Sequence, residues 1–158
     1  MIILAAMAVV IAVISAVLLL RPDVPPEVVV GDFVPPEFDA AAVEGLPDVG
    51  MPDLYGTLVL NENTAVSMYS APIVCGDKVQ VFFTSDATNT VWVRLRLMDQ
   101  KGTVLGQTGL LKPGEYVEYL ALDTLPGNAP VIAKILTYQP ETYYSMGSAS
   151  AEMELQNQ

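Results

Sequence analysis

Apolar and mixed side chains alternate strictly between residues 91 and 98. One side carries only aliphatic residues and the other a mixed set: Val91, Val93, Leu95 and Leu97 against Trp92, Arg94, Arg96 and Met98. Side chains of a β-strand point to opposite faces with a period of two, so this pattern predicts a strand with one buried face. Turn sequences at residues 99–102 and 112–115 each precede another extended segment. Residues 90–122 therefore predict a three-stranded β-meander.

Similar short extended segments, separated by turn residues, fill the chain from residue 55 onward. We expect strands at residues 57–60, 65–69, 78–84, 90–98, 103–105, 116–122, 131–138 and 148–155. No stretch of this region has a convincing helical period. The pattern predicts an all-β domain at residues 55–158, an immunoglobulin-like two-sheet sandwich of about seven or eight strands.

Residues 1–20 contain no charged side chain and are apolar apart from Ser15. Twenty helical residues span about 30 Å, the thickness of the hydrocarbon core of a bilayer. We expect residues 1–21 to form an uncleaved transmembrane anchor helix, ended by Arg21 and Pro22, with residues 1–20 in the lipid bilayer. A cleaved signal peptide is the alternative, but a basic start and a clear cleavage site are missing. The charges that flank this helix barely determine its orientation in the membrane. We favour a single-pass protein of the cell membrane with an extracytoplasmic domain.

Residues 22–54 form a proline-rich acidic stretch with no basic residue. Proline and like charges both extend a chain, so this composition predicts a semi-rigid stalk. Several residues are more apolar than a disordered linker needs, among them Phe33, Phe38 and residues 40–43. The alternative is therefore an arm that docks on the domain, with a short helix near residues 40–44.

The overall composition excludes several functions. The net charge of −11 opposes binding to nucleic acid and to anionic lipid headgroups. The chain has no histidine and a single cysteine, Cys75, so the usual nucleophile–base pairs and zinc sites cannot form within it. We expect no catalytic residue, no metal and no cofactor. Paired carboxylates that hydrolyse wall glycans are the one enzymatic alternative.

Two features are candidates for a binding surface. Trp92, Arg94 and Arg96 could hold a carboxylate or a sugar by stacking and bidentate hydrogen bonds. We favour the alternative, in which the arginines cover Trp92 and pair with carboxylates of a neighbouring strand. The carboxylates considered are Glu115, Glu118, Glu152 and Glu154.

The second feature is a group of tyrosines around the turn at residues 139–142. Tyr138, Tyr143 and Tyr144 offer contact area at low entropic cost, which suits a binding loop. Tyrosines also close the end of a sandwich, and we favour this structural role.

Several segments resemble a group of small, largely uncharacterised envelope proteins of Firmicutes, chiefly Clostridia-like bacteria. The matching parts are the strand at residues 91–97, the Lys-Pro-Gly-Glu turn at 112–115, Tyr-Gln-Pro-Glu-Thr-Tyr-Tyr-Ser at 138–145, and residues 38–42 and 54–56. The resemblance implies a short membrane segment, a variable linker and one exported β-sandwich. It implies no catalytic residue.

These observations favour a non-enzymatic, membrane-anchored, extracytoplasmic binding or structural module of a bacterial cell envelope. It would contact another envelope protein through an edge strand of the sandwich or through the loops at one end. The alternative is a subunit of a filament, secretion or conjugation complex. In that case the small residues of the N-terminal helix would support a homo-oligomer.

Overall fold

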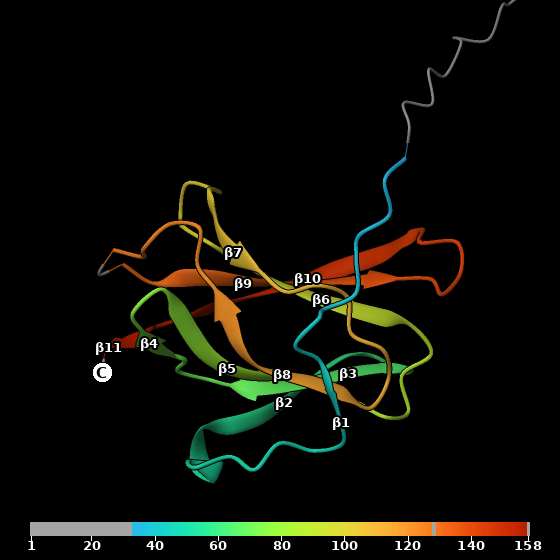
Figure 1. Ribbon diagram of the computed structural model, residues 1–158, viewed down its shortest axis with the longest axis horizontal. Helices are drawn as coiled ribbons and strands as arrows, with labels where there is room; N and C mark the ends of the chain where they lie inside the picture. The colour runs from blue at the N-terminus through green and yellow to red at the C-terminus, as the bar shows by residue number, and fades with distance from the viewer. Residues whose placement is uncertain (1–32, 128, 158) are drawn as a thin grey trace, which may run out of the picture. The chain divides into compact units, whose positions relative to one another are not determined.

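Two sheets of β-strands lie face to face as two layers in the computed structural model (Figure 1). The structure describes residues 33–127 and 129–157, and its compact unit comprises Pro35–Gln158. The one helical element of these residues is a short 3₁₀ turn, Pro52–Leu54. Nowhere in the described ranges is there a helix with the length and hydropathy to cross a membrane. The expected anchor at residues 1–21 and the first part of the stalk lie outside the described residues.

The larger sheet is built on five strands in the order β1-β8-β5-β3-β2. β4 pairs with the first half of β5, and β11 pairs in parallel with β4. The strands are β1 (Val43–Glu44), β2 (Tyr55–Asn61), β3 (Thr64–Tyr69), β4 (Ile73–Cys75), β5 (Lys78–Ser85), β8 (Glu115–Ala121) and β11 (Gln156–Asn157).

The smaller sheet has four antiparallel strands in the order β10-β9-β6-β7. They are β6 (Trp92–Met98), β7 (Val104–Gln107), β9 (Val131–Tyr138) and β10 (Ser145–Met153). Each of the eight strands predicted from the sequence corresponds to one observed strand, so the all-β two-sheet architecture is confirmed. The unexpected strands β1, β4 and β11 span two or three residues, too few to show an alternation.

The predicted meander is wrong in its third strand. β6 and β7 pair as a hairpin, whereas β8 lies in the larger sheet between β5 and β1. The connection crosses between the layers after β7, and Gly106 is where β7 meets β8. A side chain at Gly106 would overlap the backbone oxygen of Ala121, so the close approach requires glycine.

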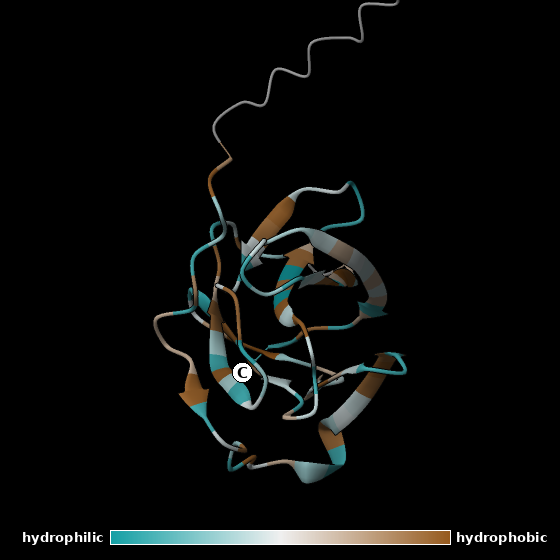
Figure 2. Ribbon diagram, turned by 90° about the vertical axis from the view of Figure 1, so that its right-hand side faces the viewer, coloured by the Kyte–Doolittle hydropathy of each residue, from teal (hydrophilic) through white to brown (hydrophobic). Residues whose placement is uncertain are grey.

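The core fills the space between the two layers. The predicted inner face of β6 is confirmed, since Val93, Leu95 and Leu97 are fully buried. Alternate residues of β9 are buried in the same way. The larger sheet covers these side chains with Val66, Val79, Val81, Phe83 and Val117. Figure 2 shows the resulting bands of hydrophobic and hydrophilic residues along the strands. The outer face of the smaller sheet is thereby left to solvent.

Part of the acidic stretch docks on the domain as an arm. The backbone of Phe38 bridges Leu110, and the N–H of Asp39 donates to the oxygen of Leu110 at 3.0 Å. The Asp39 carboxylate accepts from the N–H of Gly109 at 2.7 Å and from that of Ala41 at 2.9 Å. Both carboxylate oxygens of Asp39 therefore hold the arm in place.

The arm then continues into β1. The short helix expected near residues 40–44 is wrong, because Val43 and Glu44 pair with Tyr116 and Glu115 of β8. Hydrogen bonds to the edge of a sheet satisfy this backbone, and an isolated turn of helix could not do so as well.

Replacing Gly109 by alanine should release the arm. A Cβ at Gly109 would overlap the backbone of Asp39, so the arm must move and its hydrogen bonds weaken. We expect a loss of about 1–3 kcal/mol in the free energy of unfolding, measured with urea. Hydrogen exchange of the Asp39 amide should accelerate at the same time. Gly50→Ala, where a Cβ meets nothing within 4 Å, is the control; equal behaviour of the two variants would contradict this account of the arm.

The β6–β7 turn should make stability depend on pH through Asp99. The N–H of Thr103 donates to the carboxylate and is the main reason why the pKa of Asp99 lies below its usual 3.8; the side chain of Thr103 and the N–H of Lys101 add to it. A folded-state pKa below the unfolded one stabilises the protein fully above pH ~4, and this contribution is lost as the pH falls through the folded value. Asp99→Asn should therefore show a smaller decrease in unfolding free energy between pH 5 and 2. Asp77→Asn, in another exposed turn, is the charge-matched control, and an unchanged slope in Asp99→Asn would refute the assignment.

Candidate binding surfaces

Trp92, at the start of β6, is the centre of an aromatic cluster. The ring of Phe38 meets it edge-on with 4.8 Å between centroids, and the ring of Tyr143 does so at 5.1 Å. Lys112 Nζ lies 4.9 Å from the centroid of Phe38, within the range of a cation–π contact. Tyr138 is the cross-strand partner of Trp92. The cluster thus joins the arm, the smaller sheet and the β9–β10 loop.

The two neighbouring tyrosines of the β9–β10 loop differ in their burial and contacts. Glu141 and Tyr143 have φ angles of 67° and 58°, a left-handed conformation that side chains rarely adopt. A hydrogen bond from Tyr143 N to Gln139 O, at 3.0 Å, helps to hold this conformation. Tyr143 packs on Trp92 as the predicted structural role requires, whereas Tyr144 is 71% exposed and free for contact.

The two arginines of β6 are held by neighbours that the sequence did not indicate. Arg94 Nε donates to the backbone oxygen of Thr108 at 2.7 Å, and Arg96 Nε donates to Gln107 Oε1 at 3.1 Å. Both partners belong to β7 or to the crossing that follows it. Neither is a carboxylate.

The predicted pairing of these arginines with glutamates of an adjacent strand is therefore wrong. Glu115 and Glu118 lie on β8, in the other sheet. Glu152 and Glu154 lie on β10 or beyond it, and β9 separates β10 from β6. The residue that the register places opposite Arg96 is Lys134 of β9. Sequence reasoning missed Lys134 because only the pairing of two distant strands brings it there.

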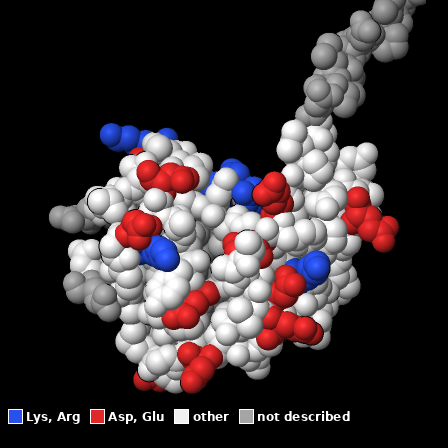
Figure 3. All heavy atoms as spheres, in the orientation of Figure 1, with Lys and Arg blue, Asp and Glu red and all other residues white. Residues whose placement is uncertain are grey.

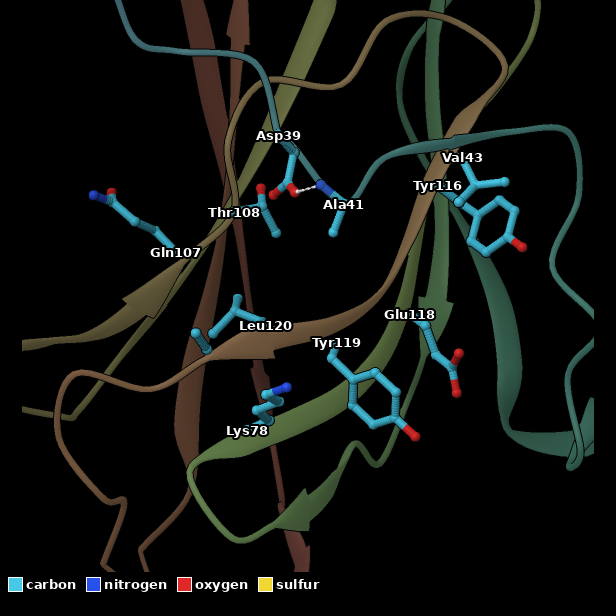
Figure 4. Close-up of a pocket in the computed structure, with 11 residues that line it drawn as sticks. Asp39, Ala41, Val43, Lys78, Gln107, Thr108, Tyr116, Glu118, Tyr119 and Leu120 are labelled. Carbon is cyan, nitrogen blue, oxygen red and sulfur yellow. Dashed lines mark hydrogen bonds between the residues drawn. The ribbon is translucent and has the colours of Figure 1, made fainter.

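A second candidate surface is a groove beside β8 with a volume of about 440 Å³. Figure 4 shows the arm on one side of this groove, with Asp39 and Ala41, and β8 on the other, with Tyr119 and Leu120. The remaining lining residues are Val43, Lys78, Gln107, Thr108, Tyr116, Glu118 and Ala121. The groove was not predicted, because it exists only where β7, β8 and the arm meet.

The groove follows an open part of the β8 edge. β1 pairs only with Glu115 and Tyr116, and the next bridge on this side of the chain joins Leu122 to Gly106. Leu122 N–H donates to Asp77 O on the β5 side. Successive N–H groups of a strand point to opposite sides, so the N–H of Ala121 points into the groove. β8 thus presents backbone groups that no strand of the described chain covers there.

Several polar side chains of the groove are engaged in structural contacts. Both carboxylate oxygens of Asp39 accept backbone N–H groups, and Glu118 Oε1 accepts from Gln80 Nε2 at 2.9 Å. Glu118 also raises the pKa of Tyr119, whose hydroxyl lies 3.4 Å from Gln80 Nε2. Within the described ranges, no group of three or more His, Cys, Asp or Glu side chains is arranged to hold a metal. The groove therefore offers backbone recognition, with Lys78 as its one basic lining residue in the described part of the chain.

The comparisons with known proteins add no relationship to this geometry. No protein-family model matches the chain, and searches of the curated proteins and of the solved structures give no significant match.

Proposed function

We propose that this chain is a non-enzymatic binding module of a bacterial cell envelope that binds an extended segment of another envelope protein along β8. Residues 1–20 would anchor it in the membrane, with the β domain on the extracytoplasmic side. The apolar first segment and the acidic, proline-rich stretch support this placement. The open edge of β8 supports the binding mode, because an extended peptide can add to such an edge as a further strand.

We further propose that the sandwich is immunoglobulin-like, which explains why this edge is open. If β3, β5, β6, β8, β9 and β10 are strands A, B, C, E, F and G, A-B-E fall in one sheet and C-F-G in the other. β7 then lies beside C, and β1 takes the place of strand D beside E. Because β1 covers only two residues of β8, most of the position of strand D is vacant. The groove is the vacant part.

A bound segment would be held mainly through its backbone. Its N–H and C=O groups would pair with those of β8, beginning at Ala121, and alternate side chains would enter the groove. The volume of about 440 Å³ lies within the range of pockets that hold ligands. Main-chain pairing supplies affinity, and the groove walls restrict which side chains fit.

The variant Ala121→Pro should abolish this binding with little change in the fold. Proline removes the N–H of Ala121, a backbone donor that points into the groove, and edge strands tolerate proline. A photo-reactive residue at position 119 in native membranes should yield a protein adduct, and Ala121→Pro should lower its yield about tenfold. Ala121→Ser retains the N–H and should keep the adduct. Equal adduct yields from the proline and serine variants would refute strand addition at β8.

The proposed orientation is tested independently of the partner. Protease added to intact protoplasts should degrade the β domain, because an extracytoplasmic domain is accessible without lysis. A cytoplasmic protein of the same cells is the control for intact membranes. A β domain that is cut only after lysis would show that it lies on the inner side.

A further inference from the structure

The outer face of the smaller sheet concentrates positive charge on an acidic protein. Of the seven basic residues, Arg21 lies outside the described ranges, and three of the other six are neighbours on this face. These three are Arg94 and Arg96 on β6 and Lys134 on β9. On the face of the molecule in Figure 3, acidic side chains are spread widely and basic ones are fewer. We call the three basic residues the cationic patch.

The cationic patch contains a like-charge pair that the fold does not neutralise. Arg96 and Lys134 are direct partners in the antiparallel register, an arrangement that destabilises a sheet. The register places Ser150 of β10 beside Lys134 and Gln107 of β7 beside Arg96. This row of four paired residues across the sheet therefore contains no carboxylate. Glu152, the carboxylate that the register places on this face of the strands, lies one row away opposite Ile132. A bound anion would relieve the repulsion.

The arginines are oriented for such a ligand. Each uses its Nε in a hydrogen bond to the β7 side, to the oxygen of Thr108 or of Gln107. These contacts fix the guanidinium planes, and among the hydrogen bonds of the described residues they leave the Nη groups available. A carboxylate can take two parallel hydrogen bonds from such a group.

We propose that the cationic patch binds an extended segment of a partner protein that carries Glu or Asp at alternate positions. Arg94 and Arg96 are two residues apart on one strand, a spacing of about 7 Å. Side chains on one side of an extended peptide repeat at the same spacing, so successive carboxylates can meet the two guanidiniums. The arm already brings one segment of this kind, Glu37-Phe38-Asp39, beside Arg94, where they line a hollow of about 480 Å³ together with Asp123. The hollow adjoins the β8 groove and shares Asp39, Gln107, Thr108 and Ala121 with it, but none of the three residues of the cationic patch lines that groove. The proposal therefore goes beyond the function proposed above.

The first experiment compares defined peptides by fluorescence anisotropy with the full chain. A labelled peptide of four Glu-Gly repeats should bind, and the same peptide with Gln in place of Glu should not. A peptide with four adjacent Glu residues has equal charge but the wrong spacing, and it should bind about fivefold more weakly. Equal binding of the two Glu peptides, or equally strong competition by inorganic polyphosphate of the same charge, would overturn the proposal in favour of an unselective polyanion surface.

The second experiment separates binding from stability. Lys134→Gln should lower the affinity for the peptide of Glu-Gly repeats about five- to tenfold, because one cation of the patch is lost. It should also raise the melting temperature by about 1–3 °C, because the repulsion with Arg96 is removed. Lys101→Gln, in the exposed β6–β7 turn, carries the same charge change and should alter the affinity less than twofold. Tyr119→Ala, at a groove residue that does not line the hollow beside Arg94, should leave this affinity unchanged, which distinguishes the patch from the groove.

Two results would overturn the proposal. One is a loss of affinity in Lys134→Gln no larger than that in Lys101→Gln. The other is weaker binding together with a lower melting temperature, since Lys134 would then act through the fold.

Discussion

The close approach of the β7–β8 crossing to its neighbours is the constraint on which both surfaces depend. Gly106 lies against the backbone of Ala121, and Gly109 lies against the backbone of Asp39. No side chain fits at either position, so two glycines let the chain pass from one layer to the other while the arm lies on top of it. With a bulkier residue at either site, β8 or the arm would have to move. The groove between them would then lose a wall.

The crossing also determines what the two sheets expose. It places β8 beside β5, which removes Glu115 and Glu118 from the neighbourhood of Arg94 and Arg96. The arginines are then held by Thr108 and Gln107, the residues that begin the crossing. One local feature of the backbone therefore leaves the edge of β8 open and the charges of β6 without a carboxylate partner on the adjacent strands.

The sequence predicts the elements of this fold better than their pairing. A period of two identifies β6, because burial of one face repeats along a strand whatever its partner is, and turn residues delimit the other predicted strands. The turn sequence at residues 112–115 shows where β8 begins but not which sheet receives it. The spacing of β8 is also irregular: Val117 and Leu120 are both buried, and the register between β5 and β8 shifts between Gln80 and Phe83. Periodicity alone cannot reveal such a shift.

The candidate surfaces show the same difference between what the sequence predicts and what only the fold determines. Trp92, Tyr138 and Tyr143 were identified from the sequence as two separate groups, and the register with the loop conformation unites them. Phe38 completes the cluster from a segment that composition alone describes as a stalk. No sequence pattern indicates Ala121, because its proposed role depends on the direction of its backbone N–H. Chemistry carried by side chains can be read along the chain, whereas chemistry carried by register or backbone needs the fold.

An open sheet edge is also a hazard, since it can pair with the edge of any other sheet. Here the open part of β8 extends only from the end of β1 to the bridge at Leu122. The arm flanks it on one side and β7 on the other, and the charged side chain of Lys78 also lines the groove. A second sheet brings neighbouring strands and would collide with these walls, whereas a single extended chain can enter between them. The same walls that define the groove thus select for a flexible segment and against aggregation.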